Sequence, residues 1–276
     1  MKIDDRDFIR LSEYMHENYG INLSKKRTLV ESRLTNPIAV AGFDNFHDYI
    51  EDALSDKSGV KIDKLITLLT TNYTYFMRED VHYKYMTNVA LPEWTSRIKD
   101  FDLRIWSAGC SSGEEAYTTA MVLDDYFGYN KNKWDSTILA TDISPKVLAL
   151  AKAGVYPAEH LEKLPDNWAR KYFKKTPDGS CEVSDALKKE VVFREFNLMG
   201  SFQKFRRKFH IIFCRNVMIY FDTQTKAQLA KKFHDSLEAG GYLFIGMSET
   251  LSGIFNGFEQ IAPAIYKKSA GKGIIG

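Results

Sequence analysis

The chain has 276 residues, of which 44% are hydrophobic and 27% charged, as in a soluble globular protein of about two domains. Its formal net charge of +2 gives no case for a nucleic-acid binder held by phosphate contacts. The sequence contains no secretory signal and no apolar stretch of about 18 residues, so we expect a cytoplasmic protein without membrane insertion. Cys110, Cys181 and Cys214 lack the spacing of a metal site, and we expect free thiols and no metal.

The first 90 residues show helical periodicity and no convincing strand. Apolar residues from Phe8 to Tyr19 recur at three- and four-residue spacing, and Gly20 ends this pattern. A second helix is expected after Ser24 as its cap, broken near Pro37, and two short helices follow within 43–54 and 61–70. We therefore expect an all-α domain over residues 1–75, then a linker segment and helix over 76–100.

From about residue 101 the pattern changes to short apolar runs that alternate with helical stretches. The runs are "LRIWSAG", "TILATD", "VVFREFNL", "FHIIFC" and "GYLFIGM". This alternation predicts an α/β fold with a mainly parallel sheet covered on both faces, within a domain over 101–270. The alternation lapses at "TPDGSCEV", which is typical of a turn between short strands, so we expect a small insert at about 156–193.

The stretch "IWSAGCSSGEEAY", residues 105–117, places a glycine-rich turn directly after the first predicted strand. Gly109 and Gly113 carry no Cβ atom, and Glu114 begins the next predicted helix. In an open α/β sheet a ligand binds at this position, beyond the carboxyl end of the strand. An ordinary tight turn explains the two glycines equally well.

Polar side chains also end the second and third predicted strands. Asp142 lies where dinucleotide folds hold a ribose diol, although an aspartate there can simply cap the next helix. Asn197 is suited to contact an adenine edge, although asparagine is also a common turn residue. Because the sequence has no phosphate-binding loop, an adenosine ligand without a diphosphate fits best.

Five stretches resemble the chemotaxis receptor methyltransferases of the CheR type. They are "LLTTNYTYFMRE", "IWSAGCSSGEEAY", "TDISPKVLALAKAGVY", "IIFCRNVMIYFD" and "GGYLFIGMSETL", and the resemblance covers about residues 5 to 267. Members of this family use S-adenosyl-L-methionine to esterify glutamate side chains of bacterial chemoreceptors and release S-adenosyl-L-homocysteine. The resemblance implies a Rossmann-like methyltransferase sheet with a small antiparallel β insert, preceded by an all-α domain.

The resemblance also implies the site residues. The implied cofactor-binding residues come from the linker, the glycine turn and the strand ends: Asn72, Thr74, Arg78, Gly109, Glu115, Asp142, Asn197, Leu198, Arg215 and Asn216. Arg78 and Tyr220 match the family's residues nearest the transferred methyl group. Without the resemblance, Arg78 reads as a surface cation paired with Glu79 or Asp80, and Tyr220 as a core aromatic.

The expected partner is the cytoplasmic helical bundle of a chemoreceptor, and we expect a monomer. Four basic residues of the second predicted helix, Lys25, Lys26, Arg27 and Arg33, are candidates for docking the receptor, with a solvated charged face as the alternative. The resemblance also implies a hairpin around Pro177 that is a few residues shorter than in the family members that bind a receptor C-terminal peptide by strand addition. We therefore expect this protein not to use such a tether.

The predicted reaction needs no general base. A glutamate carboxylate has an ordinary pKa of about 4.3 and is already the nucleophile at neutral pH, so no histidine is assigned a catalytic role. Two other functions remain open: a methyltransferase of another substrate class, and a signalling module that binds the cofactor or a receptor without turnover.

Overall fold

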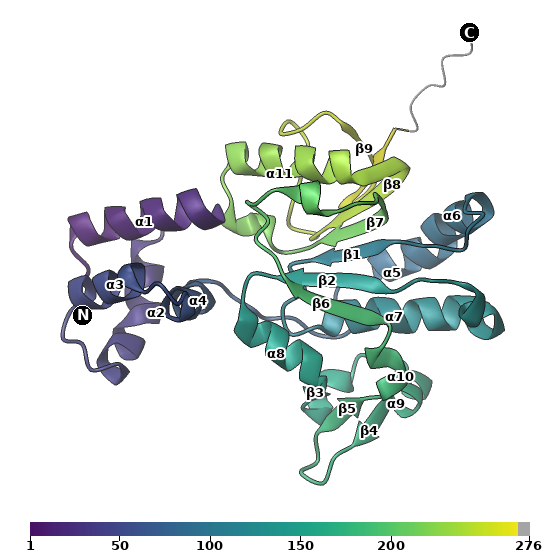
Figure 1. Cartoon of the computed structure of the whole chain (residues 1–276), viewed down its shortest axis with the longest axis horizontal. Coiled ribbons are helices and arrows are strands. Elements are labelled where there is room, and N and C mark those ends of the chain that lie inside the picture. The colour runs from purple at the N-terminus through teal and green to yellow at the C-terminus, as the bar shows by residue number, and fades with distance from the viewer. Residues whose placement is uncertain (270–276) are drawn as a thin grey trace.

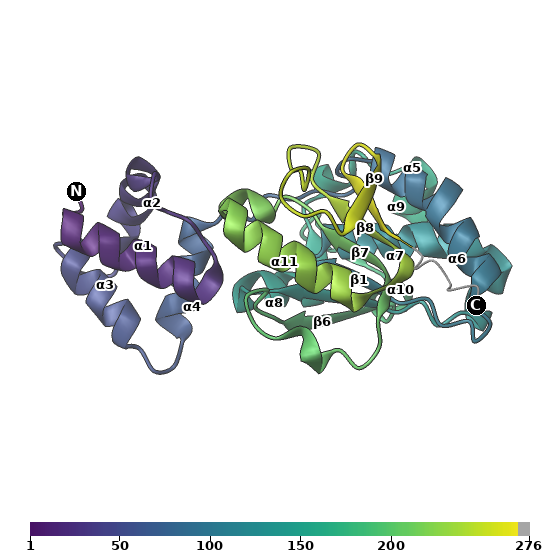
Figure 2. The same cartoon turned by 90° about the horizontal axis from the view of Figure 1, so that it is seen from above.

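A computed structural model describes residues 1–269, which form a helical domain and an α/β domain (Figure 1). Residue 270, the last of the expected second domain, lies outside the described residues. The helical domain lies at one end of the long axis of the molecule, beyond α11 (Thr223–Ser236), as Figure 2 also shows. Within residues 1–269, no helix is both long and apolar enough to cross a membrane.

The helical domain consists of α1 (Asp5–Tyr19), α2 (Arg27–Val40), α3 (Phe46–Ser55) and α4 (Val60–Leu69). The side chain of Asp4 accepts a hydrogen bond from the amide of Asp7 and begins α1. Gly20 ends α1, as predicted, in the left-handed conformation with φ 71°. The buried faces of the four helices pack into one hydrophobic cluster.

Two predictions about α2 were wrong. Ser24 does not cap the helix, because its hydroxyl donates to Oδ1 of Asn22 at 2.7 Å, and α2 begins at Arg27. Pro37 does not break the helix, which continues to Val40. Ile38 is fully buried in the last turn, and this packing outweighs the backbone hydrogen bond that proline cannot make.

A linker connects the helical domain to the sheet. After residues 70–80 the chain enters one helical segment composed of α5 (Val81–Tyr85), a π-helical turn (Met86–Ala90) and α6 (Leu91–Arg97). Phe76 of the linker is fully buried against Tyr156 and Phe173. The linker is therefore fixed along the α/β domain.

The sheet has seven strands in the order β6-β2-β1-β7-β8-β10-β9. Its strands are β1 (Ile105–Ala108), β2 (Ile138–Asp142), β6 (Val191–Glu195), β7 (Phe209–Cys214), β8 (Leu237–Ile245), β9 (Phe258–Ala262) and β10 (Ile265–Lys268). The first five of these are parallel, whereas β10 runs antiparallel to β8 and β9 antiparallel to β10. The predicted mainly parallel sheet is confirmed.

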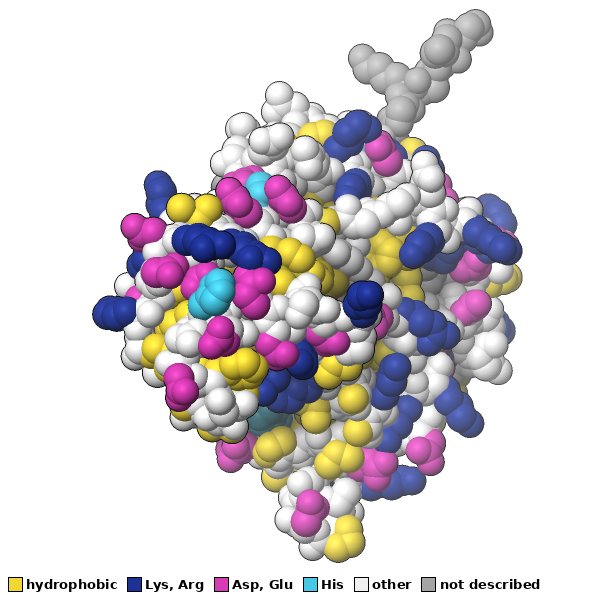
Figure 3. All heavy atoms as spheres, turned by 60° about the vertical axis from the view of Figure 1, so that its left-hand side comes forward, with side chains coloured by type: hydrophobic (Ala, Val, Ile, Leu, Met, Phe, Trp, Pro, Cys, Tyr) yellow, Lys and Arg dark blue, Asp and Glu magenta, His cyan; other side chains and the backbone are white. Residues whose placement is uncertain are grey.

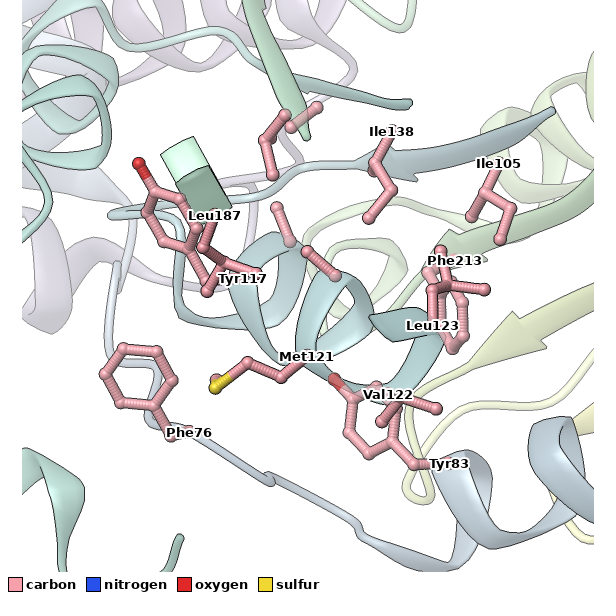
Figure 4. Packing of buried hydrophobic residues seen from close by; sticks show 14 of the residues in the cluster. Phe76, Tyr83, Ile105, Tyr117, Met121, Val122, Leu123, Ile138, Leu187 and Phe213 are labelled. Atoms are coloured by element: carbon pink, nitrogen blue, oxygen red, sulfur yellow. The ribbon is translucent and has the colours of Figure 1, made fainter. Parts of the chain in front are cut away.

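Alternate residues of each strand contribute to two hydrophobic clusters on opposite faces of the sheet. Ile105 and Phe213 belong to the cluster that includes Tyr117 and Met121 of α7 (Glu114–Phe127), whose packing Figure 4 shows. Trp106 belongs to the other cluster, which contains residues of α11 and of the helical domain. The helical domain thus shares a continuous core with one face of the sheet.

The predicted antiparallel insert follows α8 (Pro145–Ala153) and contains β3 (Val155–Tyr156), β4 (Phe173–Lys175) and β5 (Cys181–Val183), in the order β3-β5-β4. It also holds the helices α9 (Asp166–Tyr172) and α10 (Asp185–Lys188). The expected boundary at 193 was too late, because Val191–Phe193 pair with β2 in the large sheet.

Candidate functional site

A cavity of about 210 Å³ lies beyond the carboxyl ends of β1, β2, β6 and β7 and is lined also by the linker. Every residue expected at the cofactor or at the methyl group lines it: Asn72, Thr74, Arg78, Gly109, Glu115, Asp142, Asn197, Leu198, Arg215, Asn216 and Tyr220. The four basic residues expected to dock a receptor are not among the lining residues. The structure therefore brings the expected site together in one place.

The two glycines of the first turn are required by backbone conformation and packing. Gly109 has φ 86°, and a Cβ atom there would lie 2.4 Å from Cγ2 of Val217. Gly113 has φ 97°, and its Cβ would lie 2.9 Å from that of Ala151. The turn is thus a tight strand-to-helix connection in which Gly109 also lines the cavity, so the two readings of the sequence are compatible.

Asp142 fixes the glycine turn against the second strand. Its buried carboxylate accepts hydrogen bonds from the amide of Ser111 at 2.8 Å and from the amide of Ser144 at 3.0 Å. Burial raises the pKa of Asp142, and these amide donors oppose the shift. Each oxygen keeps a further lone pair, so a ribose diol can donate to the same carboxylate.

Asn197 makes contacts that account for much of its side chain. Its Nδ2 donates to the carbonyl of Asn18 in the helical domain at 2.8 Å, and its Oδ1 accepts from the amide of Met199 at 2.9 Å. Asn197 therefore acts as a turn residue, which was one of the two possibilities from the sequence, and it also forms a hydrogen bond between the two domains. The predicted adenine contact at Asn197 and the buried Leu198 stays a prediction.

Arg215, directly after β7, is a buried cation held between two glutamates. Its guanidinium donates to Oε2 of Glu79 at 3.1 and 3.2 Å, to Oε2 of Glu115 at 3.1 Å and to the hydroxyl of Tyr83 at 3.2 Å. Its remaining N–H bonds the carbonyl of Arg78. These bonds use all the N–H donors of the guanidinium. Its side chain thus orients Glu115 rather than offering a free donor to a ligand.

Glu115 is a second carboxylate that lines the cavity, with its side chain only 11% exposed. Its Oε1 accepts from the hydroxyl of Ser107 at 2.7 Å, while Oε2 accepts from Arg215. Burial raises the pKa of Glu115, and the charge of Arg215 opposes the shift. A cationic amino group binding here would relieve the desolvation of this carboxylate.

Arg78 and Tyr220 both line the cavity and contact the linker. Arg78 donates to the carbonyl of Tyr73 at 2.8 Å and pairs with neither Glu79 nor Asp80, which bind Arg215 and Lys84 instead. The alternative reading of Arg78 as one half of a surface ion pair is therefore wrong.

Tyr220 is half-buried: its side chain packs against the hydrophobic cluster, as the core reading predicts, and it also lines the cavity. Its hydroxyl accepts from the amide of Thr71 at 2.9 Å and lies 3.1 Å from the carbonyl of the same residue. The tyrosine therefore links the loop after β7 to the start of the linker.

Sequence reasoning missed several residues of this region, and four of them shape the site most directly. Tyr19 and Ile21 line the cavity from the helical domain, and only the tertiary fold brings them there. Glu249 accepts from the amides of Asn216 and Gly246 through Oε2 and of Ile219 through Oε1, which fixes the loop after β7. Glu79 holds Arg215. Glu79 and Glu249 lie within recognised stretches, which was the available signal.

The four basic residues of the helical domain differ in their surroundings. Lys25 is exposed, and the ammonium of Lys26 lies 5.5 Å from the ring centre of Tyr220. Arg27 donates to Asp5 at 2.6 Å, and Arg33 donates to the hydroxyl of Thr71 at 2.6 Å. Figure 3 shows acidic and basic side chains interspersed over this face of the molecule. The two arginines thus have hydrogen-bond partners within the protein, whereas Lys25 is exposed and Lys26 is half-buried beside Tyr220.

The cavity residues fit S-adenosyl-L-methionine. Glu115, in the first turn of α7, suits the amino group of its methionine part, and Asp142, at the end of β2, suits its ribose diol; both line the same cavity. Within residues 1–269, no group of three or more His, Cys, Asp or Glu side chains could hold a metal ion, and the three cysteines are buried and free.

Comparison with known proteins identifies the family. Residues 6–70 match the CheR methyltransferase all-alpha domain, and residues 72–266 match the CheR methyltransferase SAM binding domain. A chemotaxis protein methyltransferase of Borreliella burgdorferi is 44% identical, covering 98% of this chain and 96% of the relative. One from Escherichia coli is 32% identical, covering 98% and 93%. With its helical domain, its sheet and its cavity all inside these matches, the chain belongs to the CheR methyltransferase family.

Proposed function

We propose that this protein transfers a methyl group from S-adenosyl-L-methionine to glutamate side chains of chemoreceptors. The cavity carries this proposal, because it combines the buried Glu115 and Asp142 with Arg78 and Tyr220 from the linker and the loop after β7. Relatives that cover nearly the whole chain are named chemotaxis protein methyltransferases, which supports the same reaction.

When bound, S-adenosyl-L-methionine supplies a methyl group made electrophilic by its sulfonium. The protein must align the attacking carboxylate and exclude the water that solvates it. Glu115 would hold the amino-acid end of the cofactor and Asp142 its ribose, and Asn197 with Leu198 would lie at the adenine. The linker and the loop after β7, which line the cavity, would exclude water from the reacting atoms.

Arg78 and Tyr220 would act on the substrate carboxylate. The guanidinium of Arg78 can bind the carboxylate oxygen that does not react, because its bond to the carbonyl of Tyr73 uses only one of its five N–H donors. Tyr220 would form a wall beside the reacting oxygen and keep the linker in place through Thr71. Because strong pairing also stabilises the ground state, the benefit of Arg78 must come mainly from positioning.

The substrate would be the helical bundle of the receptor's cytoplasmic signalling region, which places the reaction in the cytoplasm. We propose that the protein acts as a monomer. Lys25 and Lys26 directly precede α2, rather than lying on it as the sequence predicted, and would attract an acidic receptor surface beside Tyr220, whose ring Lys26 contacts. Arg27 and Arg33 would support this surface by holding α2 against its neighbours.

The decisive experiment incubates the protein with methyl-labelled cofactor and purified chemoreceptor signalling domains. Label that is released as methanol by base marks a carboxyl ester and supports the proposal. Base-stable label would indicate a methyltransferase of another substrate class. Binding of the cofactor without any transfer would indicate a non-catalytic signalling module.

A further inference from the structure

Glu79 is placed where it can influence the cavity without lining it. It follows Arg78 at the end of the linker, and its side chain is 17% exposed. Its backbone has φ 55°, in the left-handed region that a glutamate rarely adopts. The surrounding contacts must therefore hold it in this conformation.

The contacts of Glu79 join three segments of the chain. Oε2 accepts both the Nε and an Nη hydrogen of Arg215, and Oε1 accepts the amide of Met247 after β8 at 3.2 Å. Burial alone would raise the pKa of Glu79, but the charge of Arg215 and the amide of Met247 lower it below its ordinary value. Glu79 is therefore an anion with fixed partners.

The pairing with Arg215 extends to Glu115. Arg215 places one nitrogen against Glu115 and is 1% exposed, so water does not compete for this charge. A single buried guanidinium is thus shared between two carboxylates. Because Glu79 neutralises part of the positive charge of Arg215, the negative charge of Glu115 is only partly neutralised. Glu115 can therefore still attract a cation in the cavity.

We infer that Glu79 is a positioning residue for cofactor binding, which acts through Arg215 to keep Glu115 available to the amino group of the cofactor's methionine part. This inference rests on the role of Glu115 in the proposed function. Neutralising Glu79 leaves Arg215 facing Glu115 alone, and Glu115 is then paired more completely within the protein. The adenosine end of the cofactor, held at Asp142 and Asn197, does not depend on this pairing.

The test compares two ligands by calorimetry. S-adenosyl-L-homocysteine carries the amino-acid part, whereas 5′-methylthioadenosine has the same nucleoside without it. In Glu79→Gln the affinity for the first should fall by about tenfold, the scale of one charged hydrogen bond, and the affinity for the second should hardly change. Glu93→Gln is the matched control, because Glu93 is a half-buried carboxylate bound to Lys267 at 2.8 Å that lines no part of the cavity.

The outcomes separate this inference from the proposed site. Glu115→Gln should show the same selective loss, and if it does not, the assigned role of Glu115 is wrong. Glu115→Gln could lose affinity only for S-adenosyl-L-homocysteine while Glu79→Gln loses affinity for both ligands equally, or for neither. Glu79 would then have only a structural role. A selective loss in Glu93→Gln would also overturn the inference.

If Glu79→Gln does not fold, a second variant tests the same inference. Glu79→Asp keeps the charge, tolerates the positive φ and withdraws the carboxylate from Arg215 by one methylene. It should show a smaller selective loss for S-adenosyl-L-homocysteine. An equal loss for both ligands, or no loss, would overturn the inference.

Discussion

The hydroxyl of Tyr220 lies 2.9 Å from the backbone nitrogen of Thr71, although the two residues are separated by 149 positions. This contact joins the loop after β7 to the first residues of the linker. The amide of Asn22 also donates to the carbonyl of Tyr220 at 2.8 Å, so the same residue contacts the helical domain. Tyr220 is therefore the point at which three parts of the chain meet beside the cavity.

Changes at the reacting centre should separate turnover from cofactor binding. In Arg78→Ala and Tyr220→Phe, methyl transfer should fall by about tenfold to hundredfold, because the carboxylate is no longer positioned. The affinity for S-adenosyl-L-homocysteine should change much less. Receptor methylation rates and calorimetry measure the two effects. Full turnover in both variants would show that neither residue acts on the substrate.

Loss of the Asp142 carboxylate should weaken cofactor binding. Asp142→Ala is expected to cost about 1.5–3 kcal/mol for S-adenosyl-L-methionine and for S-adenosyl-L-homocysteine, the range of a hydrogen bond to a charged group. Asp178→Ala, which removes an exposed carboxylate from the hairpin of the insert, should leave both affinities unchanged. An absence of binding heat in the unaltered protein with either ligand would contradict the assignment of the cavity.

The α/β domain was readily predictable because its signals are local. Apolar runs mark the strands, and Gly109 and Gly113 mark a turn that only glycine can form without strain. The contacts that complete the site are not local. Tyr19 reaches the cavity from the end of α1, and Glu79 pairs with Arg215, 136 positions away. Such pairings follow from tertiary packing, which neither periodicity nor a motif reports.

Receptor docking should depend on Lys25 and Lys26. Lys25→Glu with Lys26→Glu should raise the Michaelis constant for the receptor, and more at low salt than at high salt, because exposed charges are screened. Lys57→Glu with Lys64→Glu changes the charge of the same domain equally at exposed positions and is the control. Equal effects of the two pairs would point to net charge, and no effect would place docking elsewhere.

The insert should not bind a receptor C-terminal pentapeptide. Its outer strands β3 and β4 have only two and three residues, which leaves few backbone groups for an added strand. Fluorescence anisotropy with a labelled pentapeptide should show no saturation in the micromolar range. Micromolar binding, lost when Lys174 is replaced by proline to block pairing at β4, would overturn this expectation.

His82 should make the protein less stable in mild acid. Burial lowers the pKa of His82 to about 4, with the charge of Arg215 acting in the same direction and Glu79 opposing it. Below about pH 6.5, the ordinary pKa of histidine, His82 is protonated in the unfolded chain but stays neutral in the folded protein. The free energy of unfolding therefore falls as the pH drops.

The matched variant for this effect is His82→Leu. Between pH 7 and pH 5, the unaltered protein should lose about 2 kcal/mol more of its unfolding free energy than the variant. Urea unfolding at both values measures the difference. His210, whose burial lowers its pKa to about 3, is present in both proteins and cancels. Parallel pH profiles would show that folding does not lower the pKa of His82.

Both domains contribute residues to the cavity lining, so a nucleoside bound there would contact both and stabilise their association. Tyr19 and Ile21 of the helical domain line the cavity. Next to them, hydrogen bonds between Asn18 and Asn197 and between Asn22 and Tyr220 join the two domains. Mass action then stabilises the closed arrangement by about 2.7 kcal/mol at a ligand concentration one hundred times Kd. The stability of the association between the helical domain and the α/β domain therefore increases with the concentration of the methyl donor in the cell.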